Sequence, residues 1–313
     1  MEIPPQNGRQ VPRNLPAGSL LKFFSLTYGL TWTCFFSAVA LSGRFGSFIP
    51  DSPGLHTLLL ILGTFAPSLV ALGLTARDEG IPGTHALLRR LFEWRAAGRW
   101  YIFAIAYMAA IKLAVAVFTR LITGSWPPFG SEAWYVIVVA IVISTPVQAG
   151  EEIGWRGYAL PRLAERFGLA RASLFLGFIW ACWHLPLFFL PGMDKYGQSF
   201  PMFALGGIAL SIALAWLYAN TRGSLLLTML MHSAVNQTVG IVPSAVAIAA
   251  NPFALSASLV AWLTDAFLWI TAAYFLVRMR HIEWSGVEPQ PAKSAAIGPS
   301  LTSMERPRRP YGA

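Results

Sequence analysis

Apolar residues along this chain are grouped in long, nearly uncharged blocks, separated by short segments rich in Gly, Pro, Lys and Arg. A transmembrane helix needs about 20 predominantly apolar residues. Eight blocks approach or exceed that length, at roughly 20–41, 55–76, 101–122, 133–150, 171–190, 203–219, 224–243 and 256–278. The pattern therefore predicts an all-α, polytopic integral membrane protein with about eight transmembrane helices in one membrane domain, residues 20–280.

The charged residues support this prediction and suggest an orientation. Only 12% of the 313 residues are charged, against about 25% in soluble proteins. If both termini are cytoplasmic, 19 of the 23 Lys and Arg residues fall in cytoplasmic segments, and the outer loops hold only Arg44 and Lys195. This asymmetry is what the positive-inside rule predicts. We expect a multi-pass protein of the cell membrane with both termini cytoplasmic, whose net charge of +9 faces lipid and not nucleic acid.

The segments at the two ends differ in composition from the apolar blocks. Residues 1–19 and 281–313 are rich in Pro, Gly, Arg and Ser, so we expect disordered cytoplasmic tails, the second of them basic. No cleavable signal pattern precedes the first block. The two cysteines, Cys34 and Cys182, both fall in apolar blocks, where a disulfide framework is not expected.

Two further segments predict amphipathic helices at the cytoplasmic interface. Residues 84–95 carry apolar and charged side chains on opposite helical faces, and residues 161–167 link the fourth and fifth blocks. The apolar face of the first segment comprises Leu87, Leu88, Leu91 and Phe92.

Two adjacent carboxylates, Glu151 and Glu152, stand at the end of the fourth apolar block, and Arg156 follows Glu152 at helical spacing. Placing carboxylates at the end of a membrane segment costs free energy, so we expect them to have a function. Glu152 and Arg156 are compatible with a structural ion pair at the end of the helix. Glu151 has no such local partner, which favours a functional role.

Three more polar residues lie within the later apolar blocks: His184 before Pro186, and His232 with Asn236 one helical turn further on. Each residue alone is compatible with a hydrogen bond between helices. Pro186 predicts a kink near His184, because proline has no backbone donor. Counting about 1.5 Å per residue along the predicted helices, both imidazoles could meet Glu151 in the cytoplasmic half of the membrane.

Together these residues suggest hydrolysis. A carboxylate and two imidazoles, here Glu151, His184 and His232, can bind zinc with one position open for water. The same set can hold water directly, with Glu151 as general base. The Asn236 amide can donate to an oxyanion. The sequence therefore predicts cleavage of an amide or similar bond inside the membrane.

Three sequence motifs, which occur in the same order in a known family, support this prediction. Residues 151–156 read EEIGWR and fit the motif EExxxR. Residues 180–184 read WACWH and resemble the motif FxxxH, with Trp180 in place of Phe. Residues 232–236 read HSAVN and fit the motif HxxxN. The chain resembles the CAAX-protease and bacteriocin-processing family of intramembrane peptidases, also called the Abi family. The likeness covers about residues 77–240, and the motif-bearing core about 130–240.

The resemblance implies a cytoplasm-facing, eight-helix membrane peptidase. Glu151 and His184 would position the attacking water, and His232 and Asn236 would stabilise the oxyanion. The implied partners are membrane lipid and a hydrophobic or lipidated peptide or protein substrate.

The resemblance also implies supporting roles for Glu152 and Arg156. It leaves the cofactor open: zinc held by Glu151, His184 and His232 is one mechanism, and a metal-free glutamate mechanism is the other.

The charged residues inside the apolar blocks have other interpretations as well. Lys112 and Asp265 lie near the middle of the third and eighth blocks, where we hypothesise that they pair and fasten the two helices. A proton- or ion-coupled transporter could also use intramembrane carboxylates and histidines. A non-catalytic scaffold or immunity protein of the same fold is the other alternative.

Overall fold

The computed structural model describes residues 17–41, 53–243, 251–255 and 257–282. Within these ranges the chain forms helices and no strand, which confirms the predicted all-α class. The predicted tails, 1–19 and 281–313, lie almost entirely outside the described residues.

Most of the predicted apolar blocks form helices long enough to cross a membrane. Five described helices meet this condition: α1 (Ala17–Ala40), α2 (Pro53–Arg89), α3 (Gly98–Thr123), α8 (Phe200–Asn220) and α10 (Leu259–Met279). A sixth candidate span is bent by 40° between α4 (Trp134–Ser144) and the following segment, Pro146–Phe167. The prediction of a polytopic membrane protein is therefore confirmed.

The predicted number of eight spans is not confirmed. The fifth and seventh blocks form α7 (Leu169–Trp183) and α9 (Leu225–Thr238), which have 15 and 14 residues. Both are shorter than the roughly 20 residues of a full membrane crossing.

The bent segment consists of four short helical pieces. They are the 3-10 turn η2 (Pro146–Gln148), α5 (Ala149–Glu152), the π-helical turn η3 (Ile153–Ala159) and α6 (Leu160–Phe167). Proline disrupts an α-helix because it lacks the backbone N–H. This accounts for the end of α4 at Ser144, two residues before Pro146.

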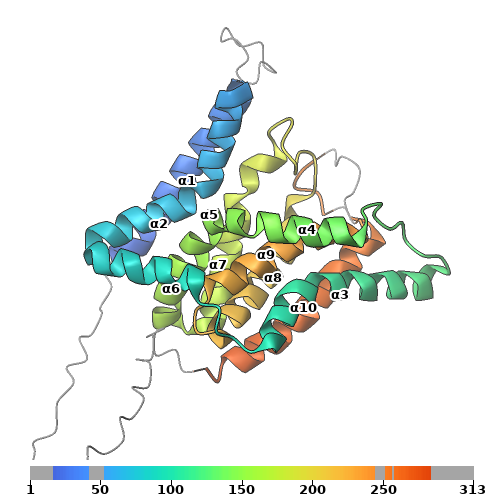
Figure 1. The fold of residues 1–313 in the computed structure, drawn as a ribbon. Coiled ribbons are helices and arrows are strands. Elements are labelled where there is room, and N and C mark those ends of the chain that lie inside the picture. Colours follow the sequence, from blue (N-terminus) through green and yellow to red (C-terminus); the bar gives the residue numbers. More distant parts are fainter. Residues whose placement is uncertain (1–16, 42–52, 244–250, 256, 283–313) are drawn as a thin grey trace, which may run out of the picture.

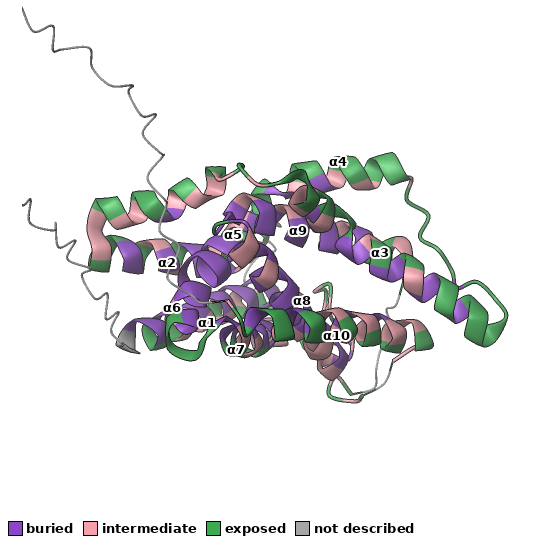
Figure 2. Cartoon of the chain, turned by 90° about the horizontal axis from the view of Figure 1, so that it is seen from below, coloured by how far each residue is buried: buried purple, intermediate pink, exposed green. Residues whose placement is uncertain are grey.

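The helices pack around the bent segment. In Figure 1, α1 and α2 form a hairpin that extends away from the rest of the helices. Helix α7 packs on α8, α3 on α9, and α10 on both α3 and α8, while α2 also contacts α5 and η3. Buried residues are concentrated where α5, α6, α7, α8 and α9 meet, whereas much of α4 is exposed (Figure 2). The carboxylates of α5 therefore lie near the centre of the molecule.

The first predicted interfacial helix exists, but one face differs from the prediction. Helix α2 continues past a kink at Gly80 (φ 68°) and is followed by the 3-10 turn η1 (Arg90–Phe92). Leu87 is buried in the core, whereas Phe92 is 77% exposed instead of sharing the apolar face. A 3-10 turn has about three residues per turn, so positions predicted from α-helical spacing are rotated around the axis.

The predicted pair of charges between α3 and α10 remains a prediction. Lys112 is fully buried, and its Nζ donates to Thr264 Oγ1 at 3.2 Å. Thr264 directly precedes Asp265 in the sequence. The opposite charges of Lys112 and Asp265 also interact electrostatically.

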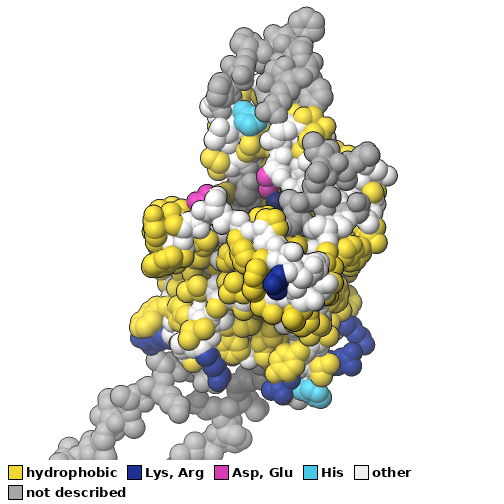
Figure 3. Space-filling view, turned by 90° about the vertical axis from the view of Figure 1, so that its right-hand side faces the viewer, with side chains coloured by type: hydrophobic (Ala, Val, Ile, Leu, Met, Phe, Trp, Pro, Cys, Tyr) yellow, Lys and Arg dark blue, Asp and Glu magenta, His cyan; other side chains and the backbone are white. Residues whose placement is uncertain are grey.

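The surface has the pattern of a membrane protein. In Figure 3, hydrophobic side chains cover most of the face in view, and most of the visible Lys and Arg side chains lie along its lower edge. A basic edge beside an apolar surface agrees with the charge asymmetry of the sequence.

Candidate active site

Close packing against α2 holds the two carboxylates inside the molecule. A Cβ atom added to Gly154 would lie 2.6 Å from the Pro67 backbone, and one added to Gly150 would lie 2.8 Å from the Phe65 ring. Ser68 Oγ also donates to the Ala149 carbonyl at 2.5 Å. The absence of side chains at the two glycines therefore allows the Glu-bearing segment to lie directly on α2.

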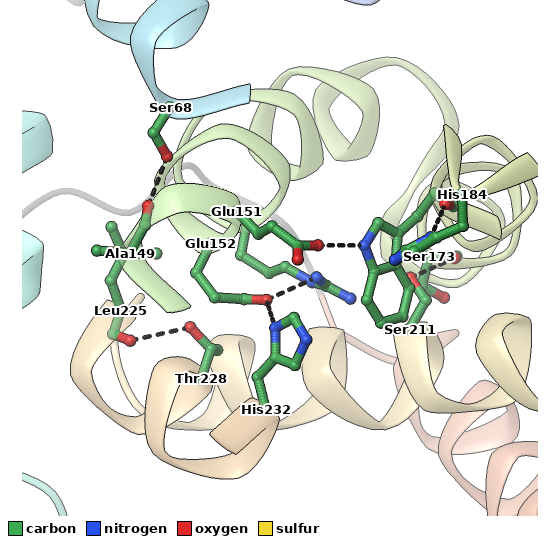
Figure 4. Close-up of polar contacts among 12 residues, drawn as sticks. Ser68, Ala149, Glu151, Glu152, Ser173, His184, Ser211, Leu225, Thr228 and His232 are labelled. Carbon is green, nitrogen blue, oxygen red and sulfur yellow. Dashed lines mark hydrogen bonds and ion pairs between the residues drawn. The ribbon is translucent and has the colours of Figure 1, made fainter. Parts of the chain in front are cut away.

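Glu152 is the centre of a buried ionic network. Its Oε1 accepts hydrogen bonds from Arg156 Nη1 at 2.8 Å and from His232 Nδ1 at 2.9 Å (Figure 4). Glu152 and Arg156 are fully buried, and His232 is 5% exposed. The predicted Glu152–Arg156 ion pair is thus present, and it also fixes the imidazole of His232. With Nδ1 donating to the carboxylate, the free edge of the ring is Nε2.

Glu151 has a different partner, which the sequence did not suggest. Its Oε2 accepts a hydrogen bond from Trp180 Nε1 at 2.8 Å, and both side chains are buried (Figure 4). Trp180 is the residue that replaces Phe in the second motif. The sequence contained one indication of this hydrogen bond, the replacement of Phe by Trp, because indole has an N–H donor that a phenyl ring lacks.

His184 lies where α7 ends. The helix stops at Trp183, and a 3-10 turn (Leu185–Phe188) containing Pro186 follows, which agrees with the predicted break. The His184 backbone N–H bonds to Ala181 and not to Trp180. The free Trp180 carbonyl instead accepts a 2.8 Å hydrogen bond from His184 Nδ1, so the neutral ring has its lone pair at Nε2.

Trp180 links the remaining members of the cluster. Its ring lies 4.6 Å from Arg156 Cζ, and its centroid lies 5.4 Å from those of both His184 and His232. Four side chains, those of Glu151, Arg156, His184 and His232, are therefore gathered around one indole ring. Glu152 joins the cluster through Arg156 and His232.

Asn236 is the predicted residue that does not join this cluster. It lies one turn beyond His232 on α9, as its spacing predicted, but its side chain is exposed. Its role toward an oxyanion stays a prediction.

Zinc also stays a prediction. Among the residues that the structure describes, no three His, Cys, Asp or Glu side chains form a group that could hold a metal ion. The Nδ1 atoms of His184 and His232 already have hydrogen-bond partners.

Fold and site together define a polytopic helical membrane protein with a buried centre of carboxylate, guanidinium and imidazole groups. Residues 129–238 match the family model described as type II CAAX prenyl endopeptidase Rce1-like. A curated relative, CAAX prenyl protease 2 of Methanococcus maripaludis, is 26% identical over 225 residues, which cover 68% of this chain and 81% of the relative. The resemblance to the CAAX-protease and bacteriocin-processing family is confirmed. The range contains all three motifs.

Proposed function

We propose that this protein is an intramembrane endopeptidase that hydrolyses a peptide bond in a hydrophobic or lipidated substrate, with prenylated C-terminal CAAX peptides as the first class to test. The observation that carries the proposal is the gathering of Glu151, His184 and His232 around Trp180, inside the residues that match the endopeptidase model.

In the proposed mechanism, Glu151 and His184 activate a water molecule. Glu151 uses Oε2 for Trp180, and Oε1 is the oxygen that this bond leaves for the water proton. As the proton moves to Glu151, the water oxygen bonds to the peptide carbonyl carbon and an oxyanion forms. Glu151 then returns the proton to the leaving amine as the C–N bond breaks. General acid–base catalysis of this kind contributes about 10²- to 10⁴-fold to a rate.

His232 and Asn236 are the proposed donors to the oxyanion. His232 keeps Nδ1 on Glu152, so the ring atom proposed to face the developing charge, as an N–H donor, is Nε2. Donors that are fixed before the reaction stabilise an oxyanion without reorganisation at the moment of reaction. Glu152 and Arg156 therefore act by holding His232 in place.

We also propose that the protein lies in the cell membrane with both termini and the site on the cytoplasmic side. The support is the distribution of Lys and Arg, with 19 of 23 in the segments assigned to that side.

Peptide cleavage by purified protein in detergent tests the proposed function. A prenylated CAAX peptide and a library of hydrophobic peptides serve as substrates, and mass spectrometry identifies the products. Glu151→Ala is compared with Glu132→Ala, whose carboxylate is exposed and lies within the same matched range. We expect cleavage by wild type and Glu132→Ala, and none by Glu151→Ala.

Two outcomes would change the proposal. Cleavage that persists in Glu151→Ala contradicts the proposed site, and absence of cleavage from wild type with every substrate favours the scaffold or transporter alternatives. Addition of a chelator decides the cofactor: lost activity that zinc restores indicates a metal enzyme, and unchanged activity indicates the glutamate mechanism.

A further inference from the structure

We propose that Trp180 is a positioning residue that sets the geometry of both water-activating groups, Glu151 and His184. The inference rests on the proposed function, but the contacts that carry it are independent of the substrate. No motif of the resemblance assigns a polar role to this position, where Phe is usual.

The two ends of Trp180 hold the two groups separately. Its indole Nε1 donates to Glu151 Oε2 at 2.8 Å, and its backbone carbonyl accepts from His184 Nδ1 at 2.8 Å. One residue thereby fixes which carboxylate oxygen is engaged and which imidazole nitrogen has the lone pair. Catalytic groups must be held close to their productive geometry by neighbours whose own positions are fixed.

The packing of Trp180 fixes the indole itself. Its ring is 5% exposed and lies 4.6 Å from Arg156 Cζ, as in a cation–π contact. The His184 and His232 rings meet it edge-on, at interplanar angles of 74° and 89°. Contacts on several sides leave the indole little freedom to rotate, so the direction of its N–H is set before substrate binds.

A phenyl ring at this position would keep only part of this arrangement. Phe can pack against Arg156 and the imidazoles, and its backbone carbonyl would still accept from His184. It cannot donate to Glu151, so the carboxylate would lose its buried hydrogen bond. Trp180→Phe therefore separates the hydrogen bond from the packing.

The first measurement is steady-state cleavage by Trp180→Phe. Hydrogen bonds to charged groups are strong enough that losing this one corresponds to roughly a 10- to 100-fold change in rate. We expect kcat to fall by that factor, with KM within about twofold of wild type, because the proposed role of the indole is to position Glu151 and not to bind substrate. Trp216→Phe is the matched control, since Trp216 stacks on Phe275 in a different part of the core. It should leave both constants unchanged.

The second measurement reads the hydrogen bond without any substrate. The chain has 12 Trp residues, each of which should give one indole N–H signal in a ¹⁵N–¹H NMR spectrum of the labelled protein in detergent. Trp180→Phe removes one signal and so assigns it, and Trp180→Tyr assigns the same signal if the Phe variant does not fold. We expect Glu151→Ala to move this signal upfield, because its acceptor is lost.

The outcomes separate the inference from the proposed function. A Trp180 signal that stays in place in Glu151→Ala overturns the inference, as does a Trp180→Phe protein with wild-type kcat. A shifted signal in a protein that cleaves no peptide leaves the contact established and overturns the proposed function alone.

Discussion

At the scale of single residues, the buried Glu152 network is the most constrained feature of the molecule. The carboxylate accepts from Arg156 and from His232, and neither Glu152 nor Arg156 has any exposed surface. Removing one partner of a buried ion pair is costly because it leaves the other charge without compensation. We therefore infer a structural role for this network, and the proposed mechanism adds a functional role through His232.

Arg156→Met should destabilise the protein by about 3–5 kcal/mol, because Glu152 would remain buried with one charged partner removed. Thermal unfolding of the purified protein in detergent measures the change. Arg171→Met is the control, since Arg171 is exposed at the start of α7, and it should change stability by less than about 0.5 kcal/mol. If both variants unfold at the wild-type temperature, the stability of the protein does not depend on the ion pair between Glu152 and Arg156, which would contradict this prediction.

The sequence predicted which residues form the candidate site better than it predicted their hydrogen-bond partners. Motif spacing identified Glu151, His184 and His232, and the structure brings them together around Trp180. The indole donor was missed because spacing along a chain carries no information on which side chains meet between helices. Asn236 shows the same limit, since its spacing is correct but its side chain is exposed.

At the scale of elements, the bent segment that follows α4 determines where the carboxylates lie. Its π-helical turn follows Glu152 directly, and its glycines lie against α2. Such turns are rare and are frequently found at functional sites. Hydrophobic periodicity predicted the helical blocks but not this turn, which depends on contacts with α2.

Gly154→Ala should destabilise the protein by about 1–3 kcal/mol, because the new methyl group would lie 2.6 Å from the Pro67 backbone and would force α2 and η3 apart. Gly73→Ala is the matched control. A Cβ there meets nothing within 4 Å, and alanine favours a helix over glycine by about 1 kcal/mol. Unfolding temperatures of the two variants should therefore shift in opposite directions. Equal shifts would contradict the close approach of η3 to α2.

At the scale of the whole molecule, the proposal depends on which side of the membrane the site faces. The basic residues in Figure 3 lie mostly along one edge of an apolar surface. The charge distribution of the sequence predicted this asymmetry, because it depends on loop composition and not on packing. The number of complete crossings was less predictable, since α7 and α9 are apolar but short.

Reporter fusions test the orientation. A fluorescent protein fused to either terminus should fluoresce, and alkaline phosphatase fused there should be inactive, because both termini are expected in the cytoplasm. A fusion in the loop that contains Lys195 should give the reverse pattern. Active phosphatase at the C-terminus would contradict the proposed orientation of the site.

The most direct test of the central claim is the rate constant for peptide cleavage by Glu151→Gln, which keeps the size of the side chain but removes the base. The account predicts a rate at least about 100-fold below that of the exposed-site control Glu132→Gln, assayed on the same substrate. Equal rates for the two variants would show that Glu151 does not activate the water, and would contradict the mechanism proposed for this site.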